Sequence, residues 1–102
     1  MEPDKILEEL CEGILKLETK EEVFNFLKDI CTPAEIKALK ERFFVAKTLY
    51  STNLSYREIQ KQTNASLTTI GRVARFLINE PYAGYKSVLN KLGYQQTKKD
   101  QI

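Results

Sequence analysis

Histidine is absent from this chain of 102 residues, and long apolar runs are absent as well. Without histidine the chain lacks the commonest general base and the commonest metal ligand near neutral pH. Its four glycines form neither a G-x-x-x-x-G-K-[ST] nor a G-x-G-x-x-G phosphate-binding loop. No apolar segment approaches the roughly 20 residues that a membrane-spanning helix needs. These absences argue against an enzyme, a cofactor and a membrane protein.

Cysteine is scarce, with two residues in the chain. Cys11 and Cys31 lack the C-x-x-C spacing that is typical of zinc sites, and both lie in apolar-periodic segments that predict small buried side chains. The chain opens without a signal peptide, which favours the reducing cytoplasm. A disulfide between Cys11 and Cys31 is the alternative that the sequence leaves open. Only 3 prolines and 42% hydrophobic residues indicate one folded domain.

Charge is divided unevenly along the chain, although the net charge is only +2. Residues 1–46 carry 7 Lys/Arg and 11 Asp/Glu, a charge of −4, whereas residues 47–102 carry 9 and 3, a charge of +6. A basic second half is expected if one face of the protein binds the phosphates of a nucleic acid. Chance clustering of the basic residues is the alternative.

Apolar residues recur at three- and four-residue intervals, and no segment alternates as a strand does. Thr19 with Glu22, and Thr32 with Glu35, predict helix starts of the capping-box type. The predicted fold is all-α, with six helices at about 4–17, 20–30, 33–52, 56–62, 67–79 and 81–92. Gly93 is expected to close the last helix, and residues 94–102 form a polar tail that is expected to fray.

The third predicted helix has apolar residues on more than one side, including Leu39, Phe43 and Leu49. A chain of this size cannot cover that surface together with the apolar stripes of the first two helices. We therefore expect helices 4–52 to form a homodimer interface and residues 1–93 to act as one domain.

The stretch from Ser55 to Phe76 predicts two short helices joined by a tight turn. Ser55 and Glu58 form a capping box, and Ser66 can cap the second helix. Asn64 stands where a left-handed backbone conformation is expected, which Asn tolerates better than most residues. This is the layout of a helix-turn-helix, here at residues 55–79.

The second helix of this motif has two different faces. The apolar residues Ile70, Val73, Ala74 and Leu77 follow the i, i+3, i+4, i+7 pattern of a buried face. Thr68, Thr69, Arg72 and Arg75 form the other face, which suits a DNA major groove. A solvated face without any ligand is the alternative, as is a surface for a protein partner.

Three segments in this order resemble the bacterial Trp repressor superfamily, most closely its YerC/YecD branch: Cys31 to Leu39 followed by Arg42, Leu54 to Ile59, and Leu67 to Arg72. The resemblance covers residues 5–93 and implies an intertwined, all-helical homodimer that binds double-stranded DNA at a pseudo-palindromic site. Arg57 matches a DNA-contacting arginine of the family and Thr69 a threonine, whereas Tyr56, Gln60 and Leu67 are substitutions. The predicted DNA-binding residues are Tyr56, Arg57, Gln60, Lys61, Ser66, Leu67, Thr68, Thr69, Arg72 and Arg75.

The resemblance also implies an effector pocket, because the Trp repressor, after which the superfamily is named, holds an amino-acid corepressor between two arginines. Both arginines are kept here as Arg42 and Arg72. Val73 and Phe76 replace a glycine and a serine, and the Phe76 ring would fill volume that an indole needs. We therefore expect that tryptophan does not bind, and the sequence names no other effector. Arg72 could instead contact DNA or pair with an acidic residue of the first half.

Overall fold

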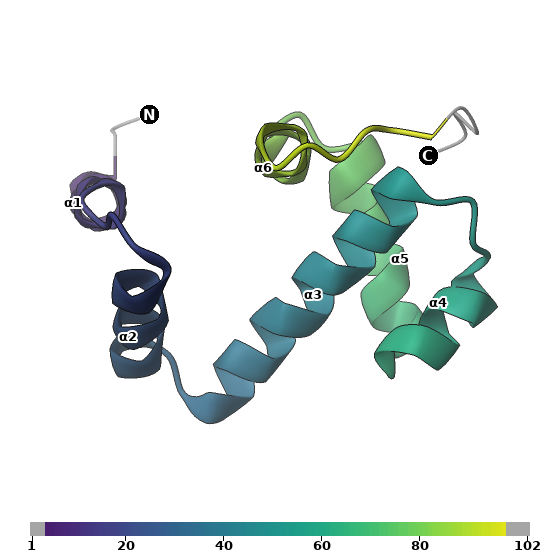
Figure 1. Ribbon diagram of the computed structural model, residues 1–102, viewed down its shortest axis with the longest axis horizontal. Helices are drawn as coiled ribbons and strands as arrows, with labels where there is room; N and C mark the ends of the chain where they lie inside the picture. The colour runs from purple at the N-terminus through teal and green to yellow at the C-terminus, as the bar shows by residue number, and fades with distance from the viewer. Residues whose placement is uncertain (1–3, 98–102) are drawn as a thin grey trace. The chain divides into compact units, whose positions relative to one another are not determined.

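The computed structural model describes residues 4–97, and every regular element in that range is a helix (Figure 1). The elements are α1 (Lys5–Leu15), α2 (Lys20–Ile30), α3 (Pro33–Ser51), α4 (Tyr56–Thr63), α5 (Leu67–Ile78) and α6 (Gly84–Lys91). The predicted all-α class and the six helices are confirmed.

The helix starts follow from local hydrogen bonds of the kind that the sequence predicts. The Glu35 N–H donates to Thr32 Oγ1 at 3.1 Å, and the Thr32 N–H donates to the Glu35 carboxylate at 2.8 Å. The capping box expected at Thr19 is wrong in one of its two bonds. Thr19 caps α2 alone, because the Glu22 carboxylate accepts from the Glu18 N–H instead of the Thr19 N–H. These caps satisfy N–H groups that have no partner inside the helix.

Two helix ends differ from the sequence expectation by more than one residue. α1 ends at Leu15, two residues early, and α6 begins at Gly84, three residues late. Ala83, the residue before α6, has a left-handed backbone with φ 56° and makes no side-chain cap. Tyr82 therefore lies in the turn between α5 and α6. Gly93 has φ 98° after the end of α6, as expected.

The chain divides into two compact units between Ile36 and Lys37, inside α3. In the first unit neither α1 nor α2 contains a buried residue. Their apolar faces are exposed, with Ile6, Leu7, Leu10, Ile14, Leu15, Val23, Phe24 and Ile30 among the exposed large side chains. Cys11 is exposed too, so the expectation of a buried side chain there is wrong. The reason is that its apolar stripe has no cover within this unit.

The second unit contains one buried apolar cluster. It is built from α3 to α6 and from the turn residue Ala65, and its members are Val45, Ala46, Leu49, Tyr50, Ile59, Ala65, Ile70, Val73, Ala74, Leu77 and Leu89. The Tyr50 hydroxyl bonds to Asn90 Oδ1 at 2.7 Å and so links α3 to α6. This unit holds the helix-turn-helix on a packed core.

The tail is better ordered near α6 than the sequence suggests. Tyr94 packs against the core, and the Thr97 N–H donates to the Tyr50 carbonyl at 3.0 Å. The expectation of fraying is therefore wrong for residues 94–97, and residues 98–102 lie outside the described range. Across the described part of the chain, no helix has the length and apolar character needed to cross a membrane.

Candidate nucleic-acid interface

The turn between α4 and α5 is fixed by short-range hydrogen bonds. Ser55 and Glu58 make both bonds of a capping box, at 3.2 and 2.8 Å. Asn64 ends α4 with φ 61°, in the left-handed region, and Ser66 Oγ then accepts from the Thr69 N–H at 3.0 Å. Ala65, between them, is buried in the core. The predicted helix-turn-helix is therefore present, and its turn is anchored from inside.

The second helix of the motif, α5, presents a narrow polar stripe to solvent. Its buried residues are Ile70, Val73, Ala74 and Leu77. Thr68, Arg72 and Arg75 follow the i, i+4, i+7 spacing on the opposite side, and all three are exposed. A hydroxyl near the helix start followed by two guanidinium groups is thus displayed on one face.

The first motif helix α4 adds a second basic edge. Ile59 is completely buried, so the side of α4 that carries it faces the core. Arg57 and Lys61 are one turn apart on the side away from Ile59, and both are exposed. Tyr56 is 44% exposed at the start of α4, and Leu67 is 43% exposed at the start of α5. The face therefore combines cations with two apolar side chains.

Two of the ten expected contact residues, Gln60 and Thr69, are half-buried, and Thr69 also bonds to Ser66 within the motif. The Ser66 hydroxyl caps α5 and also bonds to Thr69 Oγ1 at 3.1 Å. The other eight expected DNA-binding residues are exposed, namely Tyr56, Arg57, Lys61, Ser66, Leu67, Thr68, Arg72 and Arg75.

Both arginines of α5 have neighbours that the sequence analysis missed. Arg75 Nε bonds to the Glu80 carboxylate at 3.1 Å. The guanidinium of Arg72 lies 4.6 Å from the centre of the Phe76 ring, and that of Arg75 lies 5.3 Å from it. Tyr82 stacks on Phe76 with ring centres 6.4 Å apart. The i, i+4 spacing of Arg72 and Phe76 was a usable signal, whereas Glu80 and Tyr82 reach these groups only because the chain turns after α5.

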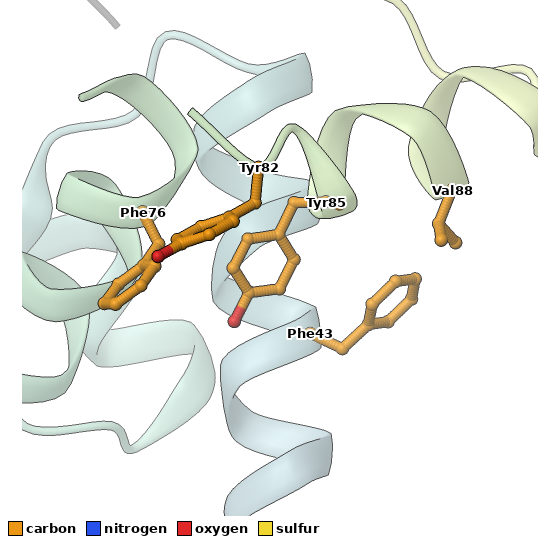
Figure 2. Close-up of a pocket in the computed structure, with 6 residues that line it drawn as sticks. Phe43, Phe76, Tyr82, Tyr85 and Val88 are labelled. Carbon is orange, nitrogen blue, oxygen red and sulfur yellow. The ribbon is translucent and has the colours of Figure 1, made fainter. Parts of the chain in front are cut away.

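The four residues expected around an effector do not line one pocket together. An apolar pocket of about 430 Å³ is lined by Phe43, Phe76, Tyr82, Gly84, Tyr85 and Val88. Figure 2 shows Phe76 and Tyr82 together at one end of this pocket and Val88 at the other. Of the expected four, only Phe76 lines it. Val73 is buried in the core, Arg42 is half-buried on α3, and Arg72 covers the Phe76 ring.

The side chains that the structure describes do not form a metal site. Within residues 4–97 no three His, Cys, Asp or Glu side chains are grouped so that they could hold an ion. The face described above joins arginines, a lysine and hydroxyl groups, which are hydrogen-bond donors of the kind that anions accept from.

Comparison with known proteins identifies the family to which this fold belongs. Residues 5–93 match the sequence family described as Trp repressor protein. The chain is 38% identical over 93 residues to the uncharacterised protein YerC of Bacillus subtilis (strain 168), which covers 91% of this chain and 88% of YerC.

Two crystal structures agree with this comparison. One, solved as a candidate Trp repressor from Staphylococcus aureus, superposes with a TM-score of 0.86 at 34% identity and covers 93% of both chains. The other, a TrpR-like protein from Eubacterium eligens ATCC 27750, has a TM-score of 0.82 at 39% identity and covers 91% of this chain and 94% of that chain. The chain therefore belongs to the Trp repressor family, in the group that includes YerC.

Proposed function

We propose that this protein is a cytoplasmic transcriptional regulator that binds double-stranded DNA sequence-specifically as a homodimer, without a tryptophan corepressor. Membership of the Trp repressor family supports a DNA-binding regulator in general. The observation that carries the proposal is the exposed stripe of Thr68, Arg72 and Arg75 on α5, beside Arg57 and Lys61 on α4.

Each part of this face has a distinct role in the proposal. The start of α5 enters the major groove, where Thr68 and Thr69 meet base edges and Leu67 meets a thymine methyl group. Arg57, Lys61 and Arg75 contact phosphates and fix the register of the protein on the duplex. Arg72 contacts phosphate or a base edge beside them. Base contacts then supply the sequence preference.

Dimerisation is proposed from the uncovered apolar surface of the first unit. α1 and α2 expose apolar faces without a single buried residue, and Leu39, Phe43 and Phe44 on α3 are exposed as well. A second copy would cover surface that a monomer leaves in water. Two-fold symmetry then places two recognition helices about one helical turn, ~34 Å, apart, so the site is pseudo-palindromic.

The test is selection of bound duplexes from a random DNA pool, with no added ligand, at low and at physiological salt. We expect enrichment of a pseudo-palindrome at both. If about four to six phosphates are neutralised, affinity should fall about 10²- to 10³-fold between 50 and 200 mM salt. Absence of binding to any duplex at low salt would contradict the proposal.

Arg57→Ala is expected to weaken duplex binding about tenfold, because it removes one exposed cation from the phosphate-facing side of α4. The slope of log affinity against log salt should become shallower by about one for each helix-turn-helix of the dimer that loses a phosphate contact. Fluorescence anisotropy with a labelled duplex measures both quantities. Lys91→Ala, an exposed cation on α6, is the matched control, and an equal loss in that variant would show that only net charge matters.

Tryptophan is not expected to bind. Phe76 carries a ring where the Trp repressor has a small residue, and the Arg72 guanidinium already lies over that ring, 4.6 Å from its centre. Isothermal titration of the protein with L-tryptophan should give only heats of dilution up to millimolar concentration. Saturable binding at micromolar concentration would mean that Phe76 moves aside and that the ligand-free proposal is wrong.

A protein-interaction module is the second candidate. The exposed side chains of Tyr56 and Leu67 at the two helix starts favour it, since aromatic residues are enriched in protein interfaces and the buried centre of an interface is apolar. The two candidates differ in their response to salt. A protein partner held by Tyr56 and Leu67 should bind almost equally at 50 and 200 mM salt, whereas duplex DNA should not.

A further inference from the structure

We propose that Phe76 is a positioning residue for DNA binding, whose ring holds the guanidinium groups of Arg72 and Arg75 ready for phosphate. This inference rests on the function proposed above. It assigns Phe76 a task on the DNA-binding face rather than in a ligand pocket.

The geometry places a single ring next to both cations of α5. Arg72 lies one helical turn before Phe76, and its guanidinium carbon is 4.6 Å from the ring centre. Arg75 is the preceding residue, and its guanidinium carbon is 5.3 Å from the same centre. Both distances fall within the roughly 6 Å over which a cation is attracted to an aromatic ring. One side chain can therefore orient two arginines.

Tyr82 supports the ring from the turn that follows α5. Its ring is nearly parallel to that of Phe76, at an interplanar angle of 18° and a centre-to-centre distance of 6.4 Å, and Figure 2 shows the two side by side. Glu80, in the same turn, accepts from Arg75 Nε at 3.1 Å. The turn thus fixes the ring and one arginine together.

Stacking is compatible with phosphate binding because of the shape of guanidinium. Its flat face attaches to a ring, while its N–H groups point outward in the plane and can donate to phosphate oxygens. An arginine that is already oriented loses less conformational freedom on binding than a free one. Arg75 would use its terminal nitrogens, since Glu80 occupies Nε.

The position of Phe76 on the helix agrees with this role. Ile70, Val73, Ala74 and Leu77 form the buried stripe, and Phe76 lies beside it, half-buried, next to the polar stripe. A ring with a purely structural task in lining the pocket would affect stability but would not act through the arginines. The experiment separates these two roles.

The experiment is a double-mutant cycle in which affinity for double-stranded DNA is measured. The duplex has a mixed sequence and about 30 base pairs, which is long enough for the two α5 helices of the dimer to bind one helical turn apart. Phe76→Leu keeps an apolar side chain but removes the ring, and Phe76→Tyr restores a ring. Both changes are made in the wild type and in an Arg72→Ala/Arg75→Ala background. Circular dichroism and sedimentation confirm that each variant is folded and has the same assembly state as the wild type.

We expect Phe76→Leu to weaken binding about 5- to 20-fold and to make the salt dependence shallower, since two ring contacts are lost. Phe76→Tyr should bind within about twofold of the wild type. In the background without the two arginines, Phe76→Leu should have no further effect. Tyr82→Leu, at an exposed position, tests the same stack without touching α5 and should weaken binding about twofold.

Two results would overturn the inference while the proposed function stands. One is wild-type affinity in both Phe76→Leu and Tyr82→Leu. The other is an equal loss from Phe76→Leu with and without the arginines. Failure of the wild type to bind any duplex at low salt would instead remove the proposed function, and the inference with it.

Discussion

Replacing Leu10 and Ile14 by aspartate is expected to convert the protein into a monomer and to reduce duplex affinity more than about 100-fold. Both side chains lie on the apolar face of α1 and are 37% and 47% exposed. Two carboxylates there would have to be desolvated at the interface of the proposed dimer. A monomer also has only one helix-turn-helix, so it loses the gain in affinity from linked binding at two sites, which is typically 10²–10⁴-fold. Analytical ultracentrifugation and anisotropy measure the two effects.

Glu9→Ala is the matched control, because Glu9 is exposed on the opposite face of the same helix. It should leave both the assembly state and the affinity unchanged. A double aspartate variant that sediments like the wild type would show that α1 does not contribute to a dimer. A wild type that is monomeric at micromolar concentration would refute the dimer itself.

Ile70→Ala is expected to destabilise the protein by about 2–5 kcal/mol. Ile70 is completely buried, in the first half of α5, and its truncation leaves a cavity in the cluster that holds α5 in place. Urea denaturation followed by circular dichroism should show a lower midpoint with an unchanged slope.

Ile78→Ala removes the same atoms from the other end of α5, where the side chain is 38% exposed. It should cost less than about 1 kcal/mol, since little cavity forms at the surface. Equal losses from the two variants would mean that Ile70 is not a core residue in solution. Both variants are measured at one protein concentration, so that dimerisation does not affect the comparison.

The helix starts were predictable because their causes are local. Thr32, Ser55 and Ser66 each bond to a backbone N–H three residues later, a relation that spacing alone reveals. The start of α6 was not predictable in the same way. Ala83 adopts a left-handed conformation that its residue type does not favour, so the turn must be held by its surroundings.

The candidate site, too, has features that local sequence predicts and features that depend on the folded chain. The outward stripe of Thr68, Arg72 and Arg75 follows from helical periodicity, once the buried face is identified. The contact between Arg72 and the Phe76 ring follows from the same periodicity, whereas the stacking of Tyr82 on Phe76 and the bond of Glu80 to Arg75 depend on how the chain turns after α5. The exposure of Cys11 was mispredicted because an apolar stripe reports only that cover is needed and not which chain provides it.

The uncovered faces of α1 and α2 have a consequence for the cell's control of this regulator. In the proposed dimer those helices gain their apolar contacts only when two chains meet, so the DNA-binding form is made by a second-order association. At low abundance, the amount of dimer rises with the square of the protein concentration. Small changes in synthesis or degradation of the chain would therefore produce disproportionately large changes in promoter occupancy.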